Sequence, residues 1–103
     1  MVECLQPAEA KLLIRHCLEV GSVKLGFHYR KRLKDRNITH TAALSVLRNG
    51  RINKAPECDI KTGDWKYLIE GREPGGEWLS IVFTFETRDD TFMITIMDDR
   101  GGW

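Results

Sequence analysis

Leu79-Ser-Ile-Val-Phe-Thr-Phe-Glu86 is the stretch of sequence that decides the fold, because apolar residues occupy every second position. Such alternation is typical of a β-strand with one face turned toward a core, since successive side chains point to opposite faces. Residues 65–70 and 92–97 show the same alternation, and residues 74–76 (Pro-Gly-Gly) and 88–90 (Arg-Asp-Asp) supply turns between the segments. The sequence therefore predicts three consecutive strands in an antiparallel meander.

The last of these strands has two consequences for the sheet. Strict alternation places Phe92, Ile94 and Ile96 on the apolar face and Thr95 on the polar face, where a plain β-forming role is the simplest interpretation. As the end of the meander, residues 91–97 also form a free edge that a partner protein could extend by strand addition.

Upstream of the strands, three segments have the period of a helix. Residues 7–20 begin with a proline, carry an apolar stripe and end before Gly21. Residues 28–38 form a basic helix, and Thr39 caps a third helix that closes at Asn49-Gly50. Residues 22–27 are a short link or a fourth strand.

These elements predict an α+β fold in two layers. We expect about three N-terminal helices packed on a three- to four-stranded antiparallel sheet. The whole chain, residues 1–103, is one domain with one modest core, and residues 1–6 and 98–103 are its mobile ends.

The charge distribution is more informative than the net charge of +1. Basic residues concentrate between positions 30 and 54, whereas acidic residues gather in the second half of the chain. A nearly neutral protein with one local basic segment does not fit a non-specific coat on nucleic acid. It favours a specific ligand that carries phosphate.

The cysteines and the apolar runs exclude several classes of protein. Cys4, Cys17 and Cys58 are scattered and odd in number, so they do not form a disulfide framework, and no metal-ligand spacing occurs. We therefore expect no cofactor. A signal peptide and a membrane-length apolar run are both missing from the sequence, which predicts a cytoplasmic protein without a membrane partner.

The basic helix carries the candidate site. His28, Arg32 and Arg36 recur at every fourth position, so they lie along one stripe of the helix. Arginine holds phosphate in a fixed geometry, and histidine exchanges protons near neutral pH. If this stripe is a binding surface, both arginines are exposed and contribute little to folding stability. The alternative is a solvated basic helix with ordinary ion pairs, which Asp35 would favour.

The order of motifs resembles a known family. The helix reads His-x-x-x-Arg-Leu-x-x-Arg-x-Ile over residues 28–38. It is followed by a helix ending in Asn-Gly, a strand ending in Gly-Arg, and two strands that contain Leu-x-Ile-Val-Phe and Met-Ile-Thr-Ile. Over roughly residues 27–97 this resembles a family of small bacterial proteins often encoded beside YgiT-type zinc-finger antitoxins, similar to the MqsR and RelE toxins. Tyr29 and Asn37 depart from it, since the family usually has Ala and Gly there.

The resemblance implies a toxin of a type II toxin–antitoxin pair that acts as a metal-independent endoribonuclease on messenger RNA, an mRNA interferase. Its implied partners are messenger RNA, on or off the ribosome, and a cognate antitoxin, for which a zinc-finger protein is one option. RNA cleavage through the 2′-hydroxyl requires a base, an acid and positive donors. The expected catalytic residues are His28, Arg32, Arg72 and Tyr67, and the expected phosphate-binding residues are Arg36, Arg30 and Lys66.

Alternatives remain open for several of these residues. His28 fits either proton step, and Tyr67, Lys66 or Glu70 could supply the other. Tyr67 alternates with apolar residues and equally fits the core, and Arg72 equally fits an ion pair at the rim of a strand. The alternative function is a non-catalytic module that uses the basic helix to bind nucleic acid or an acidic protein.

Overall fold

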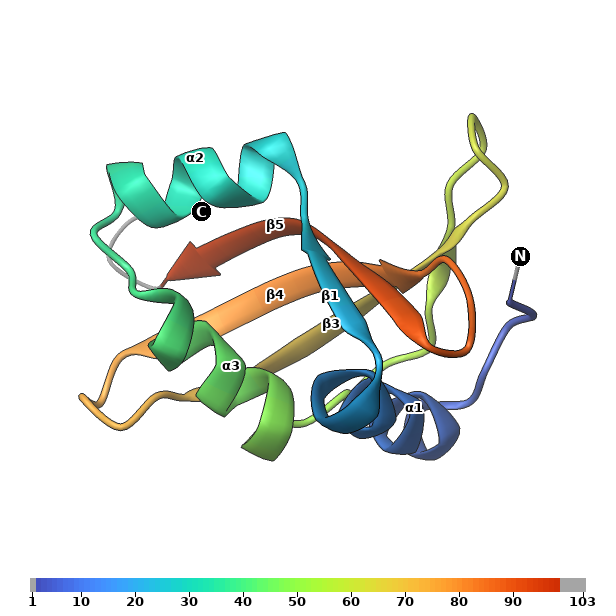
Figure 1. The fold of residues 1–103 in the computed structure, drawn as a ribbon, viewed down its shortest axis with the longest axis horizontal. Helices are drawn as coiled ribbons and strands as arrows, with labels where there is room; N and C mark the ends of the chain where they lie inside the picture. The colour runs from blue at the N-terminus through green and yellow to red at the C-terminus, as the bar shows by residue number, and fades with distance from the viewer. Residues whose placement is uncertain (1, 99–103) are drawn as a thin grey trace.

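The computed structural model describes residues 2–98, which form three helices and five strands (Figure 1). The helices are α1 (Pro7–Val20), α2 (Phe27–Asp35) and α3 (His40–Asn49). The strands are β1 (Ser22–Leu25), β2 (Glu57–Cys58), β3 (Trp65–Arg72), β4 (Trp78–Phe85) and β5 (Asp90–Asp98). The α+β class and the three N-terminal helices are confirmed. Thr39 caps α3 as predicted, since its hydroxyl accepts a hydrogen bond from the Ala42 N–H at 3.0 Å.

The sheet is larger than predicted, and it is mixed. Its order is β1-β5-β4-β3-β2, in which β3, β4 and β5 form the predicted antiparallel meander. The purely antiparallel sheet of three or four strands is wrong, because β1 pairs parallel to β5 from Ser22↔Asp90 to Leu25↔Met93. Alternation within residues 22–27 cannot reveal a partner strand at the other end of the chain, so the sequence pattern missed this pairing.

A β-bulge in β5 changes which side chains face the core. The register with β4 skips Ile94. Before the bulge Thr91 and Met93 are buried, whereas after it the buried residues are Ile96 and Asp98. The strict alternation predicted for this strand is therefore wrong, since an extra residue on one strand shifts the side-chain pattern by one position.

Helices α1 and α3 cover one face of the sheet (Figure 1). The predicted apolar face of β4 is confirmed, since the four residues that form it are all buried: Leu79, Ile81, Phe83 and Phe85. The sequence predicts mobile residues 1–6, whereas Val2 and Leu5 are buried in the core. The predicted mobile end at 98–103 lies outside the described residues except for Asp98. Large, fully buried side chains of this core include Ile14, Tyr29, Leu47, Tyr67, Ile69, Leu79, Ile81, Phe83, Met93 and Ile96.

Helix α2 lies alongside the second half of β5 (Figure 1). The chain turns into α2 at Gly26, whose N–H donates to the Met93 carbonyl at 2.9 Å. A Cβ at this position would lie 2.7 Å from that carbonyl oxygen, so the close approach requires glycine. The free edge predicted for residues 91–97 is therefore wrong: β1 pairs with the first half of β5, and α2 borders the rest.

Candidate functional site

Helix α2 and the bulged part of β5 enclose an open groove of about 370 Å³. We call it the α2–β5 groove. The helix contributes His28, Lys31, Arg32 and Asp35, which are spaced three or four residues apart and share one face. The strand contributes Ile94 and Thr95, the two neighbours at the bulge. Two of the three residues of the predicted stripe, His28 and Arg32, therefore lie in one groove.

The opposite face of α2 holds the helix in place. Tyr29 is fully buried in the core, and Leu33 packs against it. The Tyr29 hydroxyl lies 3.2 Å from Nδ1 of His40 on α3. The departure from the family pattern at Tyr29 thus serves packing. Asn37, which follows the C-cap residue of the helix, has a φ of 55°, a left-handed conformation that asparagine tolerates. The firmly seated helix therefore fixes the backbone positions from which His28 and Arg32 extend.

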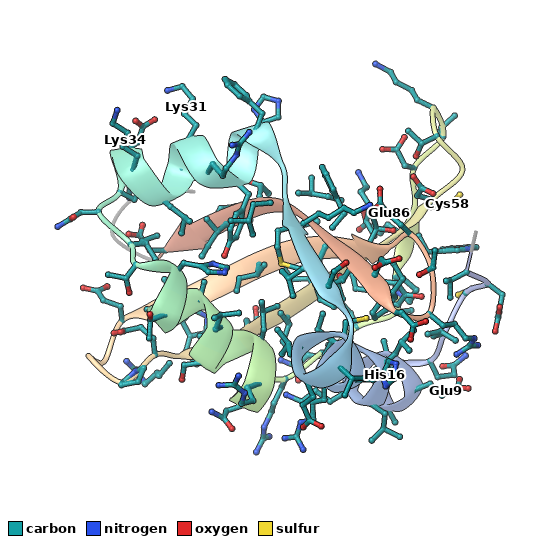
Figure 2. The ribbon with its side chains drawn as sticks, viewed as in Figure 1. Glu9, His16, Lys31, Lys34, Cys58 and Glu86 are labelled. Carbon is teal, nitrogen blue, oxygen red and sulfur yellow. The ribbon has the colours of Figure 1, made fainter. Side chains whose placement is uncertain are left out.

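The groove is electrically positive on balance. The Lys31 ammonium lies 2.8 Å from the Asp35 carboxylate, and this hydrogen bond lowers the pKa of Asp35. Lys31 and Lys34 project from α2 away from the sheet (Figure 2). Within residues 2–98, no ion pair uses His28 or Arg32. One cation in the groove is thus balanced by Asp35, whereas the Arg32 guanidinium remains available to an anion.

An aromatic ring stands beside this charge. Phe27 is 69% exposed, although it is a large apolar residue. Its ring meets the His28 imidazole edge-on, with centroids 5.7 Å apart and planes inclined at 76°. An exposed ring next to a cationic groove offers a surface on which a nucleobase can stack.

Arg36 is not part of this groove. It follows α2 as its C-cap residue, and its guanidinium donates to Oδ1 of Asp98 from Nη2 at 2.8 Å and from Nε at 3.2 Å. The Asp98 side chain is fully buried. The structure therefore gives Arg36 a structural role, tying the end of α2 to the end of β5, in place of the predicted phosphate contact.

The remaining predicted site residues lie elsewhere. Tyr67 is buried, and its hydroxyl accepts the Leu5 N–H at 3.0 Å, so it belongs to the core. Arg72 donates to the Gly76 carbonyl at 2.8 Å in the β3–β4 hairpin, and its guanidinium lies 5.8 Å from the centre of the Trp78 ring.

Three further predicted residues, Lys66, Glu70 and Arg30, are also outside the α2–β5 groove. Lys66 lies 3.7 Å from the Asp59 carboxylate, and Glu70 accepts from the Asn53 amide at 3.1 Å. Arg30 is exposed on α2 without lining the groove. Of the predicted catalytic and phosphate-binding residues, the structure therefore brings together His28 and Arg32.

Sequence reasoning missed Lys31 and Thr95 in the groove and Phe27 beside it. Lys31 follows His28 by three positions, which is a helical neighbour spacing that could have identified it. Phe27 gives no such signal, because an isolated phenylalanine before a helix usually packs. Thr95 reaches the groove beside Ile94 through the bulge, which the sequence pattern does not indicate.

Neither a cluster of metal ligands nor a membrane-spanning helix is found in the part of the chain that the structure describes. No group of three His, Cys, Asp or Glu side chains is placed to hold a metal ion in residues 2–98. None of the helices in that range is long and apolar enough to cross a bilayer.

Comparison with known proteins identifies one family. A family model described as "Domain of unknown function (DUF4258)" matches residues 25–98, which contain the whole α2–β5 groove and leave α1 outside. No curated protein and no solved structure gives a match to the chain. Because the family model covers well over half of the sequence, the chain belongs to the DUF4258 family.

Proposed function

We propose that this protein is a cytoplasmic toxin of a type II toxin–antitoxin pair, and that it cleaves messenger RNA in the α2–β5 groove without a metal ion. The observation that carries the proposal is the convergence of His28, Arg32 and Lys31 on one groove, on a helix anchored by a fully buried tyrosine. The resemblance of the motif order to MqsR and RelE toxins supports the same function.

The groove supplies the groups for attack by the RNA on its own backbone. The ribose 2′-oxygen bonds to the adjacent phosphorus, and the bond from phosphorus to the 5′-oxygen breaks, which leaves a 2′,3′-cyclic phosphate and a 5′-hydroxyl. The Arg32 guanidinium stabilises the additional negative charge on the phosphorane. His28 takes the 2′-proton or protonates the leaving 5′-oxygen. The Thr95 hydroxyl can hydrogen-bond the ribose or the phosphate, and Phe27 can stack with a base.

A specific observation also supports the alternative, a non-catalytic RNA-binding module. His28 is the one histidine among the described groove residues, and an imidazole is the side chain suited to exchanging protons under physiological conditions. The groove therefore holds a group for one of the two proton transfers, and the other proton must be exchanged with solvent. Binding needs only the cations and the ring, whereas cleavage needs His28 to act.

Cleavage of an end-labelled RNA, followed on a denaturing gel, separates these functions. Arg32→Gln should reduce the cleavage rate by about 10²-fold or more, as for other donors to a developing oxyanion. His28→Gln should reduce it by about 10²–10⁴-fold. The matched control is Lys34→Gln, which removes one charge from the same helix outside the groove and should change the rate little.

Binding is measured separately with a 2′-O-methyl RNA, which lacks the nucleophilic hydroxyl. Cleavage that depends on His28, with a cyclic phosphate product, is the result we expect. Binding that depends on Arg32 without any cleavage would assign the module function instead. Wild-type protein that neither binds nor cleaves RNA would contradict both functions.

The proposed antitoxin must cover or distort the α2–β5 groove. An acidic partner would be steered toward the basic face of α2, which contains Arg30, Lys31, Arg32 and Lys34. Inducible expression should then arrest bacterial growth, and co-expression of the neighbouring gene should relieve the arrest. Normal growth with abundant folded protein would contradict the toxin function.

A further inference from the structure

A second basic groove lies where α1 passes the C-terminal end of α3. We call it the α1–α3 groove. It has a volume of about 390 Å³ and is open to solvent. The charged residues that line it, Lys11, Arg15 and Arg51, are all basic, and Asn49 and Asn53 add amide groups. In Figure 1, α1 lies on the opposite side of the ribbon from α2, so this groove is remote from the α2–β5 groove.

Two of these cations are fixed by the last turn of α3. Nζ of Lys11 donates to the Arg48 carbonyl at 3.1 Å and also to the Gly50 carbonyl, and Nε of Arg15 donates to the Arg48 carbonyl at 3.1 Å. Cations are favourable at a helix C-terminus. Because an ammonium has three donors and a guanidinium five, both side chains keep N–H groups that can serve a ligand.

The α1–α3 groove carries uncompensated positive charge. In the described part of the chain, no ion pair uses Lys11, Arg15 or Arg51. Among residues 2–98, the one carboxylate hydrogen-bonded to a lining side chain is that of Glu70, which accepts from the Asn53 amide. Burial, together with the positive charge of Arg15, lowers the pKa of Lys11. An anion in the groove would relieve this crowding of like charges.

We propose that the α1–α3 groove binds the phosphodiester backbone of RNA at a second place, separate from the α2–β5 groove. Guanidinium groups grip phosphate oxygens in fixed pairs, and amides serve ribose hydroxyls and phosphates. A groove whose charged side chains are all basic, with two asparagine amides beside them, fits a nucleic-acid backbone better than the mixed charges on the surface of a folded protein. The proposal shares its ligand class with the proposed function, but it does not require cleavage.

The test measures the affinity for a fluorescent single-stranded RNA of about 12 nucleotides with 2′-O-methyl riboses, by anisotropy at several salt concentrations. The variant is Arg51→Gln, which removes a lining cation and spares the two side chains that hydrogen-bond the end of α3. The matched control, Lys61→Gln, removes one charge from an exposed position outside both grooves. Circular dichroism confirms that each variant is folded.

Each phosphate contact on a single strand adds about −0.7 to the slope of log K against log salt. We therefore expect the variant to bind more weakly than the control and its slope to be shallower than that of the wild type by about 0.7. Equal affinity and equal slope in the variant and the control would overturn the proposal. The same result is expected if the ligand of this groove is an acidic protein, so that case is also decided against RNA. Arg32→Gln, measured alongside, reports on the α2–β5 groove, so either groove can fail independently.

Discussion

Arg36→Ala is the substitution for which the structure reverses the expectation from sequence. As one member of an exposed stripe, Arg36 should matter for RNA and hardly for stability. In the structure its guanidinium donates twice to Oδ1 of Asp98, and 26% of the Arg36 side chain is exposed whereas Asp98 is fully buried. The substitution therefore removes two charge-assisted hydrogen bonds from a carboxylate that water does not reach.

The expected cost follows from that burial. Removing one partner of a buried ion pair costs about 3–5 kcal/mol, and the partial exposure of Arg36 favours the lower end, about 3 kcal/mol. For a chain of this size, each kcal/mol shifts the melting temperature by about 4–8 °C, so Arg36→Ala should lower it by about 12–24 °C. Arg32→Ala, in the open groove, should change the free energy of unfolding by no more than about 0.5 kcal/mol.

Urea unfolding followed by circular dichroism measures both free energies, and Asp98→Asn completes a double-mutant cycle with Arg36→Ala. The two substitutions should be strongly non-additive, with an interaction energy of about 1–3 kcal/mol. A loss below about 1 kcal/mol for Arg36→Ala, or a cycle that closes additively, would show that the pair does not hold α2 against β5. Arg36 would then return to the candidate phosphate contacts.

Three further outcomes are expected. Tyr67→Phe removes the acceptor for the Leu5 N–H, so it should cost about 1–2 kcal/mol in urea unfolding yet leave RNA cleavage unchanged; lost cleavage in folded protein would restore the catalytic role. Burial lowers the pKa of His40, so the unfolded chain binds a proton at this histidine more readily than the folded protein does. The free energy of unfolding should therefore fall from pH 7 to pH 5 less steeply in His40→Gln than in the wild type. Equal slopes in the two proteins would contradict this. Gly26→Ala places a Cβ 2.7 Å from the Met93 carbonyl oxygen, so it should lower the free energy of unfolding in urea by about 1–3 kcal/mol and weaken RNA binding. A variant more stable than the wild type would refute the close approach.

Much of the fold could be predicted because its signals are local. The alternation in residues 79–85 and the Thr39 cap act within a few positions of themselves, and both are confirmed. The pairing of β1 with β5 depends on residues that are far apart in the sequence. The bulge at Ile94 depends on the register between β4 and β5. Neither leaves a periodic signal, so the sheet order and the faces of β5 could not be read from the sequence.

The same distinction applies to the candidate site. Helical spacing predicted that His28 and Arg32 share a face, which is a local property of α2. It could not predict that Arg36, one turn further along, would meet a carboxylate 62 positions away in sequence. Nor could it predict that the Tyr67 hydroxyl would accept a hydrogen bond from the Leu5 N–H, because the two residues are far apart in the sequence.

The pairing of β1 with β5 has a consequence for synthesis of the protein. Ser22 pairs with Asp90, and the α2–β5 groove lies between His28 and Thr95, so both features form only after β5 has been made. A ribosome that has made α1, β1 and α2 has made every proposed cation of that groove but not its opposite wall. Contacts between such distant positions also form slowly. If the protein is a toxin, its nascent chain lacks the complete α2–β5 groove until β5 has been made, and a partner made earlier has that interval in which to bind.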